Sequence, residues 1–180
     1  PQLASLVLQS PLVSTAAWLA DAAALKAAMP ADVRRMLDIC DNPGAAADAT
    51  DAACQAATDA FYARHVRRVA PPAAIAAYRD ALPVAFSQRL YGHMWGRAEF
   101  VATGTLKDYD GTALLARLDG GRTLFIAGQH DEARPVTVAG FAERAGALFA
   151  VAPDAAHSIM ADNPGWYLNL LRGWMARQDG

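Results

Sequence analysis

The sequence has little net charge and no long apolar run. Its 180 residues carry a formal charge of −2, so no strong electrostatic field would attract nucleic acid or an anionic membrane. No apolar stretch approaches the roughly 20 residues that a membrane-spanning helix needs. We therefore expect no nucleic-acid partner and no membrane partner, and we expect a cytoplasmic protein.

Cysteine is also scarce, because the chain contains only Cys40 and Cys54. They form no CxxC motif and have no histidine pattern nearby, so we expect neither a metal site nor a cofactor. We interpret both as free packing thiols, with a disulfide between two helices as the alternative. We do not expect His130 to bind a metal either, since the sequence has no HExxH motif. We expect His65 and His93 to be structural.

Apolar residues are plentiful. They make up 54% of the chain, which is enough for a buried core, and the length suits one domain. The chain opens directly into an apolar run, 3–10, that we expect to form a fully buried strand. We therefore expect the true N-terminus to lie upstream of Pro1, so the absence of a leader says nothing about the compartment.

Strand signals are confined to the two ends of the chain, and the middle is helical. Prolines and one glycine punctuate that middle part, so we expect its helices to cover 15–29, 31–41, about 48–69 and 73–82. The breaks fall at Pro30, at Asn42, Pro43 and Gly44, at Pro71 and Pro72, and at Pro83. We predict three regions: a core strand segment over 1–13, an all-helical cap over 14–98, and a parallel α/β core over 99–180.

Two apolar runs in the last region, 123–128 and 147–152, each end in a polar loop. Asp131 lies in the first loop and His157 in the second. An acid and a histidine on neighbouring strand ends can activate a serine nucleophile. On position alone, the alternative is a loop acid and a surface histidine.

Helices are expected around these strands. The segment 135–146 has a proline at its start and lies between the two strands. A last helix over about 163–177 would place an apolar stripe on the sheet, formed by Trp166, Leu170, Leu171 and Trp174. Strand, acid, helix, strand, histidine and helix resembles the back half of an α/β-hydrolase, where the nucleophile comes first in the chain.

More specific are the segments 91-YGHMWGRAEF-100 and 103-TGTLKDYD-110. They resemble the proline iminopeptidases, serine aminopeptidases of the α/β-hydrolase superfamily, which show a Tyr-x-x-Met-x-Gly-x-x-Glu-Phe run followed by Thr-Gly-Thr-x-Lys-Asp-Trp-Asp. The resemblance continues through 128-GQHDEARP-135, His157 and 162-DNPGWY-167, and so covers nearly the whole chain. It departs from the family at Tyr109 for tryptophan, Arg134 for threonine and Ala156 for serine.

The resemblance implies a role for each matched residue. Asp131 would be the triad acid and His157 the triad base. Glu99 and Glu132 would bind the free α-amine of the substrate, since two carboxylates in a partly dry pocket attract an ammonium strongly. The alternatives are that Glu132 is a solvent-facing loop acid and that Glu99 pairs with Arg97. Tyr91 and Trp95 would either line a pocket for the proline ring or simply pack within the cap.

The family's nucleophile motif is not in the sequence. There is no Gly-x-Ser-x-Gly and no His-Gly-Gly-type loop, and none of five serines lies in a strand–turn–helix elbow: Ser5, Ser10, Ser14, Ser87 and Ser158. By the family plan, about 100 residues or more should precede Pro1 and carry the serine, the oxyanion donors and five strands. We expect this N-terminal part to be a partner of the chain, which alone would be inactive.

The sequence therefore predicts the C-terminal part of an α/β-hydrolase core, interrupted by an all-helical cap. The expected activity is that of a serine aminopeptidase releasing N-terminal proline, or another N-terminal residue, from a peptide or amino-acid amide substrate with a free N-terminus. One alternative is an amino-acid amidase or another small-molecule hydrolase on the same scaffold. The other is a non-catalytic fragment or binding module.

Overall fold

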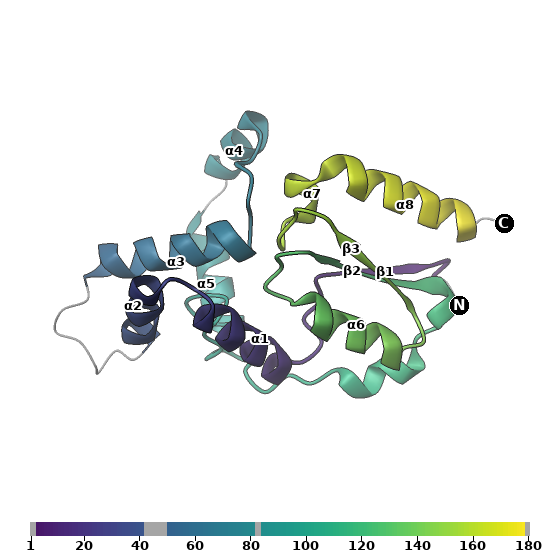
Figure 1. Cartoon of the computed structure of the whole chain (residues 1–180), viewed down its shortest axis with the longest axis horizontal. Coiled ribbons are helices and arrows are strands. Elements are labelled where there is room, and N and C mark those ends of the chain that lie inside the picture. The colour runs from purple at the N-terminus through teal and green to yellow at the C-terminus, as the bar shows by residue number, and fades with distance from the viewer. Residues whose placement is uncertain (1–2, 42–49, 82–83, 179–180) are drawn as a thin grey trace.

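A computed structural model describes residues 3–41, 50–81 and 84–178, which form a parallel sheet flanked by helices and a helical layer beside it (Figure 1). The first half contains β1 (Leu6–Gln9), α1 (Thr15–Ala27), α2 (Ala31–Asp41), α3 (Asp51–His65), α4 (Ala73–Asp80) and α5 (Val84–Met94). The second half contains η1 (Thr112–Arg117), η2 (Gly120–Arg122), β2 (Thr123–Gly128), α6 (Pro135–Arg144), β3 (Leu148–Ala152), α7 (Ile159–Asp162) and α8 (Pro164–Gln178). The predicted breaks at Asn42, Pro43, Gly44 and Pro83 lie outside the described residues, as does Pro1.

The three strands pair in the order β1-β2-β3, and both pairings are parallel. Central β2 is buried along its whole length. The predicted α/β class, with parallel strands and flanking helices, is confirmed. The prediction of a fully buried β1 is wrong, because all its residues are partly exposed. The reason is that, among the described residues, β1 pairs with a strand on one side only.

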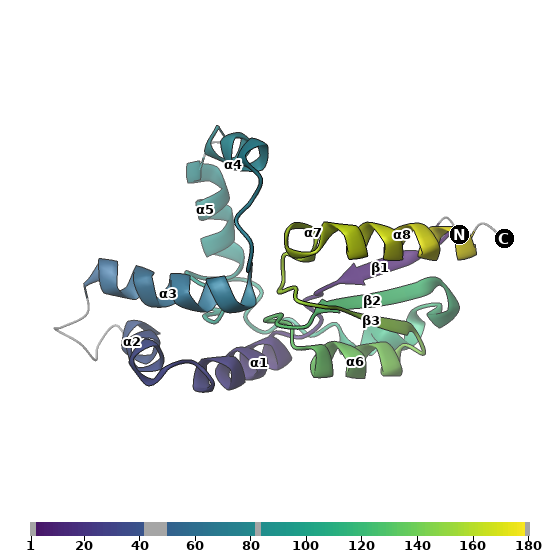
Figure 2. The same cartoon turned by 45° about the horizontal axis from the view of Figure 1, so that its top comes forward.

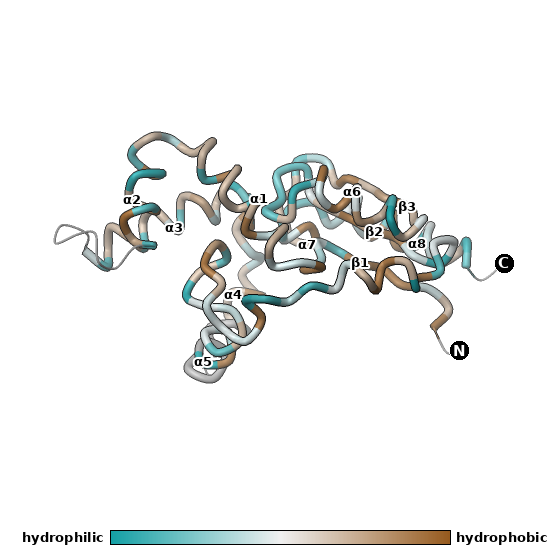
Figure 3. Tube along the Cα trace, turned by 90° about the horizontal axis from the view of Figure 1, so that it is seen from below, coloured by the Kyte–Doolittle hydropathy of each residue, from teal (hydrophilic) through white to brown (hydrophobic). Residues whose placement is uncertain are grey.

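Alternate residues of β2 serve two faces of the sheet, as a strand period of two requires. Leu124 and Ile126 pack toward α8 and its buried Trp174. Phe125 and Ala127 pack on the opposite face, in a cluster that includes residues of α6. Figure 2 shows the sheet lying between α8 and α6, and Figure 3 shows the strands mainly in hydrophobic colours. The predicted apolar stripe of the last helix lies in the α8 cluster.

The helical layer, α1 to α5, has an apolar cluster of its own around Leu37 and Phe61. Helix α3 ends at His65, four residues earlier than predicted, and a further helix, α5, follows the four predicted ranges. Among the described residues, no helix is long and apolar enough to cross a bilayer.

The prediction that the two cysteines are free thiols is wrong, because Cys40 and Cys54 form a disulfide. Cys40 lies near the end of α2 and Cys54 in the first turn of α3. Packing of these helices brings the two Cα atoms to 5.8 Å, within the range that a disulfide can bridge. The bond therefore joins the two helices around the chain segment that connects them.

Candidate active site

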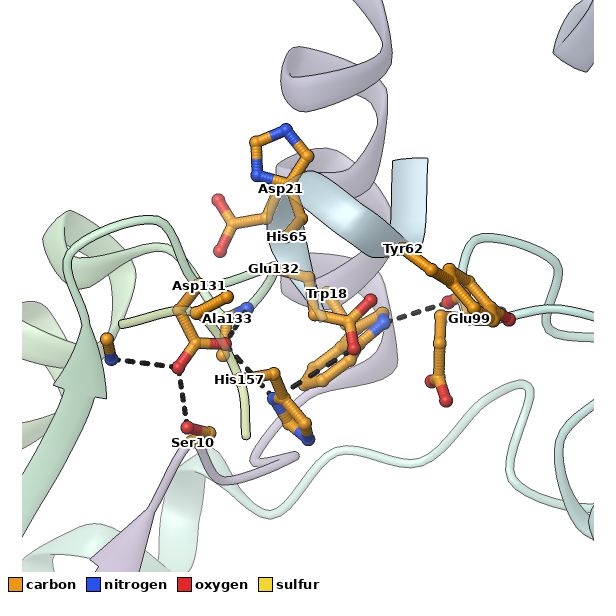
Figure 4. A network of polar contacts seen from close by, with 12 residues as sticks. Ser10, Trp18, Asp21, Tyr62, His65, Glu99, Asp131, Glu132, Ala133 and His157 are labelled. Atoms are coloured by element: carbon orange, nitrogen blue, oxygen red, sulfur yellow. Dashed lines mark hydrogen bonds and ion pairs between the residues drawn. The ribbon is translucent and has the colours of Figure 1, made fainter. Parts of the chain in front are cut away.

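Asp131 and His157 lie together where β2 and β3 end. Parallel strands direct their carboxyl ends to one edge of a sheet, which is where open α/β sheets bind ligands. His157 Nδ1 lies 3.0 Å from Asp131 Oδ1 (Figure 4). A carboxylate oxygen only accepts, so Nδ1 carries the hydrogen. Nε2 is then the ring nitrogen left for a reacting group, and within the described part of the chain it has no recorded hydrogen bond.

Asp131 is 1% exposed and is surrounded by hydrogen-bond donors. The Ser10 hydroxyl donates to Oδ2 at 2.5 Å, the Gly128 N–H to Oδ2 at 2.9 Å and the Ala133 N–H to Oδ1 at 3.0 Å. These bonds stabilise a negative charge that burial would otherwise disfavour. Sequence reasoning considered Ser10 only as a possible nucleophile. Its position directly after β1, the parallel neighbour of β2, is the signal that could have placed it here.

Gly128 allows the acid loop and the histidine loop to touch. A Cβ at this position would collide with the backbone carbonyls of Ala155 and Ala156. The His130 N–H also donates to the Ala155 carbonyl at 2.8 Å. The absence of a side chain at the end of β2 therefore sets the spacing between the loops that carry Asp131 and His157.

Burial and the neighbouring carboxylates change the pKa of His157 in opposite directions. Burial lowers the pKa of its imidazole, while the hydrogen bond and charge of Asp131, together with Glu99, raise it. The net result is a pKa above the ordinary histidine value. The site therefore favours the imidazolium that a general base forms when it takes a proton.

Glu132 is 2% exposed, so the alternative of a solvent-facing loop acid is wrong. Its Oε1 has no hydrogen-bond partner in the described part of the chain and lies 3.9 Å from His157 Nδ1. Burial is the main cause that raises the pKa of Glu132 to about 9, and the charges of Glu99 and Asp131 add to it. The carboxyl group is therefore neutral at pH 7 while the site is empty, and a cation beside it would favour ionisation.

Glu99 follows α5 and is held by its backbone. Its N–H donates to the Tyr62 hydroxyl at 3.2 Å, and its carbonyl accepts from Trp18 Nε1 at 2.9 Å. Burial raises the pKa of Glu99, while a hydrogen bond from Tyr91 and the charge of His157 lower it. Tyr62, which the sequence did not single out, thus fixes Glu99 from α3 (Figure 4).

The alternative role of Glu99, as the partner of Arg97, is not what the structure shows. Arg97 instead forms an ion pair of 2.6 Å with Asp41, at the end of α2. The same aspartate also pairs with Lys26 at 2.6 Å. The Glu99 side chain is thus not engaged by its neighbouring arginine.

An apolar cavity of about 420 Å³ adjoins Glu99. Tyr91 and Trp95 both line it, together with Leu12, Trp18, Leu90, Met94 and Leu106. Trp95 is only 6% exposed and packs edge-on against Trp18 with ring centroids 6.0 Å apart. For Trp95, packing and lining are thus compatible. Trp18 also contacts His157 edge-on, at 5.7 Å, so the cavity and the Asp131–His157 pair share a wall.

The described residues contain no group of three or more histidine, cysteine, aspartate and glutamate side chains that could hold a metal ion. His130 contributes its backbone to the loop contacts instead. His93 is exposed near the end of α5. His65 is buried beside the acid loop.

Known proteins resemble this chain over most of its length. The proline iminopeptidase of Heyndrickxia coagulans is 27% identical over 170 residues, which are 93% of this chain and 56% of that protein. The crystal structure of proline iminopeptidase from Mycobacterium smegmatis matches 98% of this chain and 58% of its own, with a TM-score of 0.84 and 30% identity. The chain has the fold of the α/β-hydrolases and is similar to proline iminopeptidases. The predicted resemblance is confirmed.

Two further relatives agree with this relationship. The proline iminopeptidase of Levilactobacillus brevis is 34% identical over 90 residues, 49% of this chain and 30% of that protein. The crystal structure of VinJ matches with a TM-score of 0.83 and 28% identity, over 98% of this chain and 58% of its own. No family sequence model matches the chain. Three of these relatives match nearly all of this chain, and the chain spans somewhat more than half of their own length.

Arg134 is the departure from the proline iminopeptidase pattern that lies nearest to the acid. Its N–H donates to Asp21 of α1 at 3.2 Å, and its side chain approaches Asp21 at 3.6 Å. The Thr137 hydroxyl donates to the same carboxylate at 2.8 Å. Asp21 therefore satisfies donors in the first turn of α6, which lacks a cap from its own N-cap side chain, and ties the acid loop to α1.

Proposed function

We propose that this chain is the C-terminal part of a serine aminopeptidase that releases proline, or another N-terminal residue, from peptides. The observation that carries the proposal is the buried Glu132 beside the Asp131–His157 pair, whose Oε1 accepts no hydrogen bond from the described residues. In this proposal, residues 14–98 form the cap over the site. The nucleophilic serine belongs to an N-terminal part that acts with this chain, and the chain alone hydrolyses nothing.

The Asp131–His157 pair would act as acid and base of the triad. Asp131 holds the imidazole through Nδ1, so His157 Nε2 takes the hydroxyl proton of the nucleophile and later gives it to the leaving amine. The donors around Asp131 hold its carboxylate in place beside the imidazolium that forms. Nucleophilic attack would give an acyl-enzyme, which water then hydrolyses to release the N-terminal residue.

Glu132 and Glu99 would recognise the substrate's ammonium group. Glu132 is neutral in the empty site, because its pKa lies at about 9. An ammonium beside the two carboxyl groups compensates the charge that burial disfavours, so Glu132 releases its proton as the substrate binds. An N-acetylated substrate brings no positive charge, so Glu132 keeps its proton and forms no ion pair with it. The same two groups thus account for amine binding and for the preference for a free N-terminus.

The cavity beside Glu99 would accept the side chain of the N-terminal residue. Its lining is apolar except for Glu99 and the Tyr91 hydroxyl, which suits a proline ring or another apolar side chain. Tyr91 and Trp95 contribute aromatic faces to this wall. The substrate class that follows is a peptide, or an amino-acid amide, with an apolar residue at its free N-terminus.

The test begins with intact-mass measurement of the purified protein under denaturing conditions, to find the polypeptide that carries the serine. Hydrolysis of a prolyl anilide and of its N-acetylated counterpart is then compared in the complete protein. We expect Glu99→Gln and Glu132→Gln to weaken use of the free-amine substrate. The control is Glu143→Gln, at an exposed residue of α6. Equal losses on both substrates contradict amine recognition, and a single 19.0 kDa species without turnover favours a non-catalytic role.

An amino-acid amidase is the second candidate. The contacts identified above concern the amine and side chain of the residue to be released, and they apply equally to an amide such as prolinamide. Comparing kcat/KM for prolinamide with that for a prolyl dipeptide separates the two functions. A preference for the amide favours the amidase.

A further inference from the structure

The C-terminal end of α3 is hydrogen-bonded to both loops of the site. The last carbonyls of a helix have no partner within the helix. Here the carbonyl of His65, the final residue of α3, accepts the N–H groups of Glu132 and His157, both at 3.2 Å. The next carbonyl, of Val66, accepts the Ser158 N–H at 2.8 Å. One helix end therefore bonds the backbones of a proposed amine-binding residue and of the proposed base.

The His65 side chain anchors this helix end to the acid loop. It is 6% exposed, and its Nδ1 lies 2.9 Å from the His130 carbonyl. A carbonyl can only accept, so Nδ1 carries the hydrogen. The His130 N–H is itself bonded to the Ala155 carbonyl, and the imidazole ring packs 5.0 Å from the ring of Phe61. Residue 130, directly before Asp131, is thus held on both sides.

We propose that His65 is a positioning residue, whose side chain fixes the Asp131–Glu132 segment against the His157 loop. It touches no reacting atom. Its Nδ1–H sets the peptide before Asp131, and its carbonyl sets the backbones of Glu132 and His157 relative to each other. This role rests on the proposed function, because it matters to catalysis only if those three residues act together. Sequence reasoning had treated His65 as structural, because nothing local connects position 65 with positions 130 to 157.

Three variants in the complete protein test the role. His65→Leu keeps an apolar volume and removes the donor. His65→Asn keeps an N–H donor close to the position of Nδ1, and His65→Ala removes donor and volume together. His93→Leu, at an exposed histidine of the same helical layer, is the matched control. The first readout is the low-field proton signal of His157 Nδ1–H bonded to Asp131, followed by NMR. The second is kcat and KM on free and N-acetylated prolyl anilides.

We expect His65→Leu to weaken or broaden the low-field signal and to lower kcat/KM for the free-amine substrate by about 10- to 100-fold, as small misplacements of catalytic groups do. The acetylated substrate should lose less, because it does not use Glu132. His65→Asn should restore both signal and rate, and His93→Leu should change neither. If His65→Leu keeps the wild-type signal and kinetics, the proposal is overturned.

A second comparison separates the positioning role from a fold defect. Should His65→Leu not fold, His65→Asn is compared with His65→Ala, since both shorten the side chain and only asparagine retains a donor. Equal signals and rates in these two variants overturn the proposal. The NMR signal requires no turnover, so the failure of the positioning role is distinguishable from the failure of the aminopeptidase function. The latter would show as a wild-type protein with the signal but without prolyl hydrolysis.

Discussion

Asp131 and Glu132 are adjacent in the chain and almost equally buried, at 1% and 2% exposure, but their surroundings are opposite. The region around Asp131 supplies a hydroxyl and two backbone N–H donors in addition to His157. Among the described residues, the region around Glu132 supplies no hydrogen-bond donor for Oε1. A buried carboxylate is stable only where donors or cations compensate its charge. The surroundings of Asp131 therefore stabilise a negative charge, and those of Glu132 do not.

This difference shows how neighbouring acids acquire different tasks. Asp131 is held by these donors and orients His157 through Nδ1. Glu132, with its pKa at about 9, remains neutral until a cation arrives. In the proposed function, Glu132 forms an ion pair only when a cation binds, so it distinguishes an ammonium from a neutral group. The contrast between the two regions can be broken in three ways.

The largest effect is expected from Asp131→Asn. The side chain keeps its size, but an amide NH₂ must face donors: the Ser10 hydroxyl, the Gly128 N–H or His157 Nδ1–H. The imidazole then loses its preferred tautomer, and turnover should fall on the order of 10⁴-fold, as for triads in general. Steady-state hydrolysis of a prolyl anilide by the complete protein measures it. Asp154→Asn, at an exposed loop acid, is the control, and near-wild-type turnover of Asp131→Asn would sink the assignment.

An intermediate effect is expected from Glu132→Gln, which should raise the free energy of unfolding. The carboxyl pKa rises from 4.5 in the unfolded chain to about 9 in the folded protein. Between these values the folded state holds a proton that the unfolded state has released, so the wild type loses stability as pH rises, by up to about 1.4 kcal/mol per pH unit. The variant lacks this loss and should be more stable by about 1–3 kcal/mol at pH 7.

Urea unfolding of wild type and Glu132→Gln at several pH values between 5 and 8 measures this difference. Subtracting the two curves removes most of the contribution of other titrating groups, including His157. The difference in unfolding free energy should grow steadily with pH. Glu143→Gln, at an exposed residue of α6, should unfold like the wild type. A difference that does not change with pH would mean that Glu132 is already ionised and partnered in the empty site.

Local pattern was sufficient for the elements that frame these two regions. The second strand occupies 123–128 as predicted, and α2 occupies 31–41. Proline and glycine marked these boundaries because they act within a few residues. Asp131 and His157 could be placed together because parallel strands direct both loops to one edge. Composition and spacing needed no tertiary information for these features.

What decided the difference between the acids was not local. One contributing residue, Ser10, directly follows β1, and two others, Tyr62 and His65, lie in α3. Each contacts a residue at least 37 positions away in the chain. The burial of Glu132 depends on how the end of α3 lies on its loop. The disulfide likewise follows from the packing of α2 on α3 rather than from the spacing of its cysteines. Such contacts depend on tertiary packing, which single-residue propensities do not encode.

The smallest effect is expected from Ser10→Ala, which removes one donor from the region around Asp131. A hydroxyl bonded to a carboxylate is a charge-assisted donor, and its loss should destabilise the protein by about 1–2 kcal/mol. The Gly128 and Ala133 N–H groups and His157 remain, so turnover should fall far less than in Asp131→Asn. Urea unfolding measures the loss against Ser5→Ala, which removes a hydroxyl that has no recorded hydrogen bond in the described part of the chain. If the two variants unfold alike, the bond from Ser10 contributes nothing, and the backbone donors and His157 make Asp131 different from Glu132.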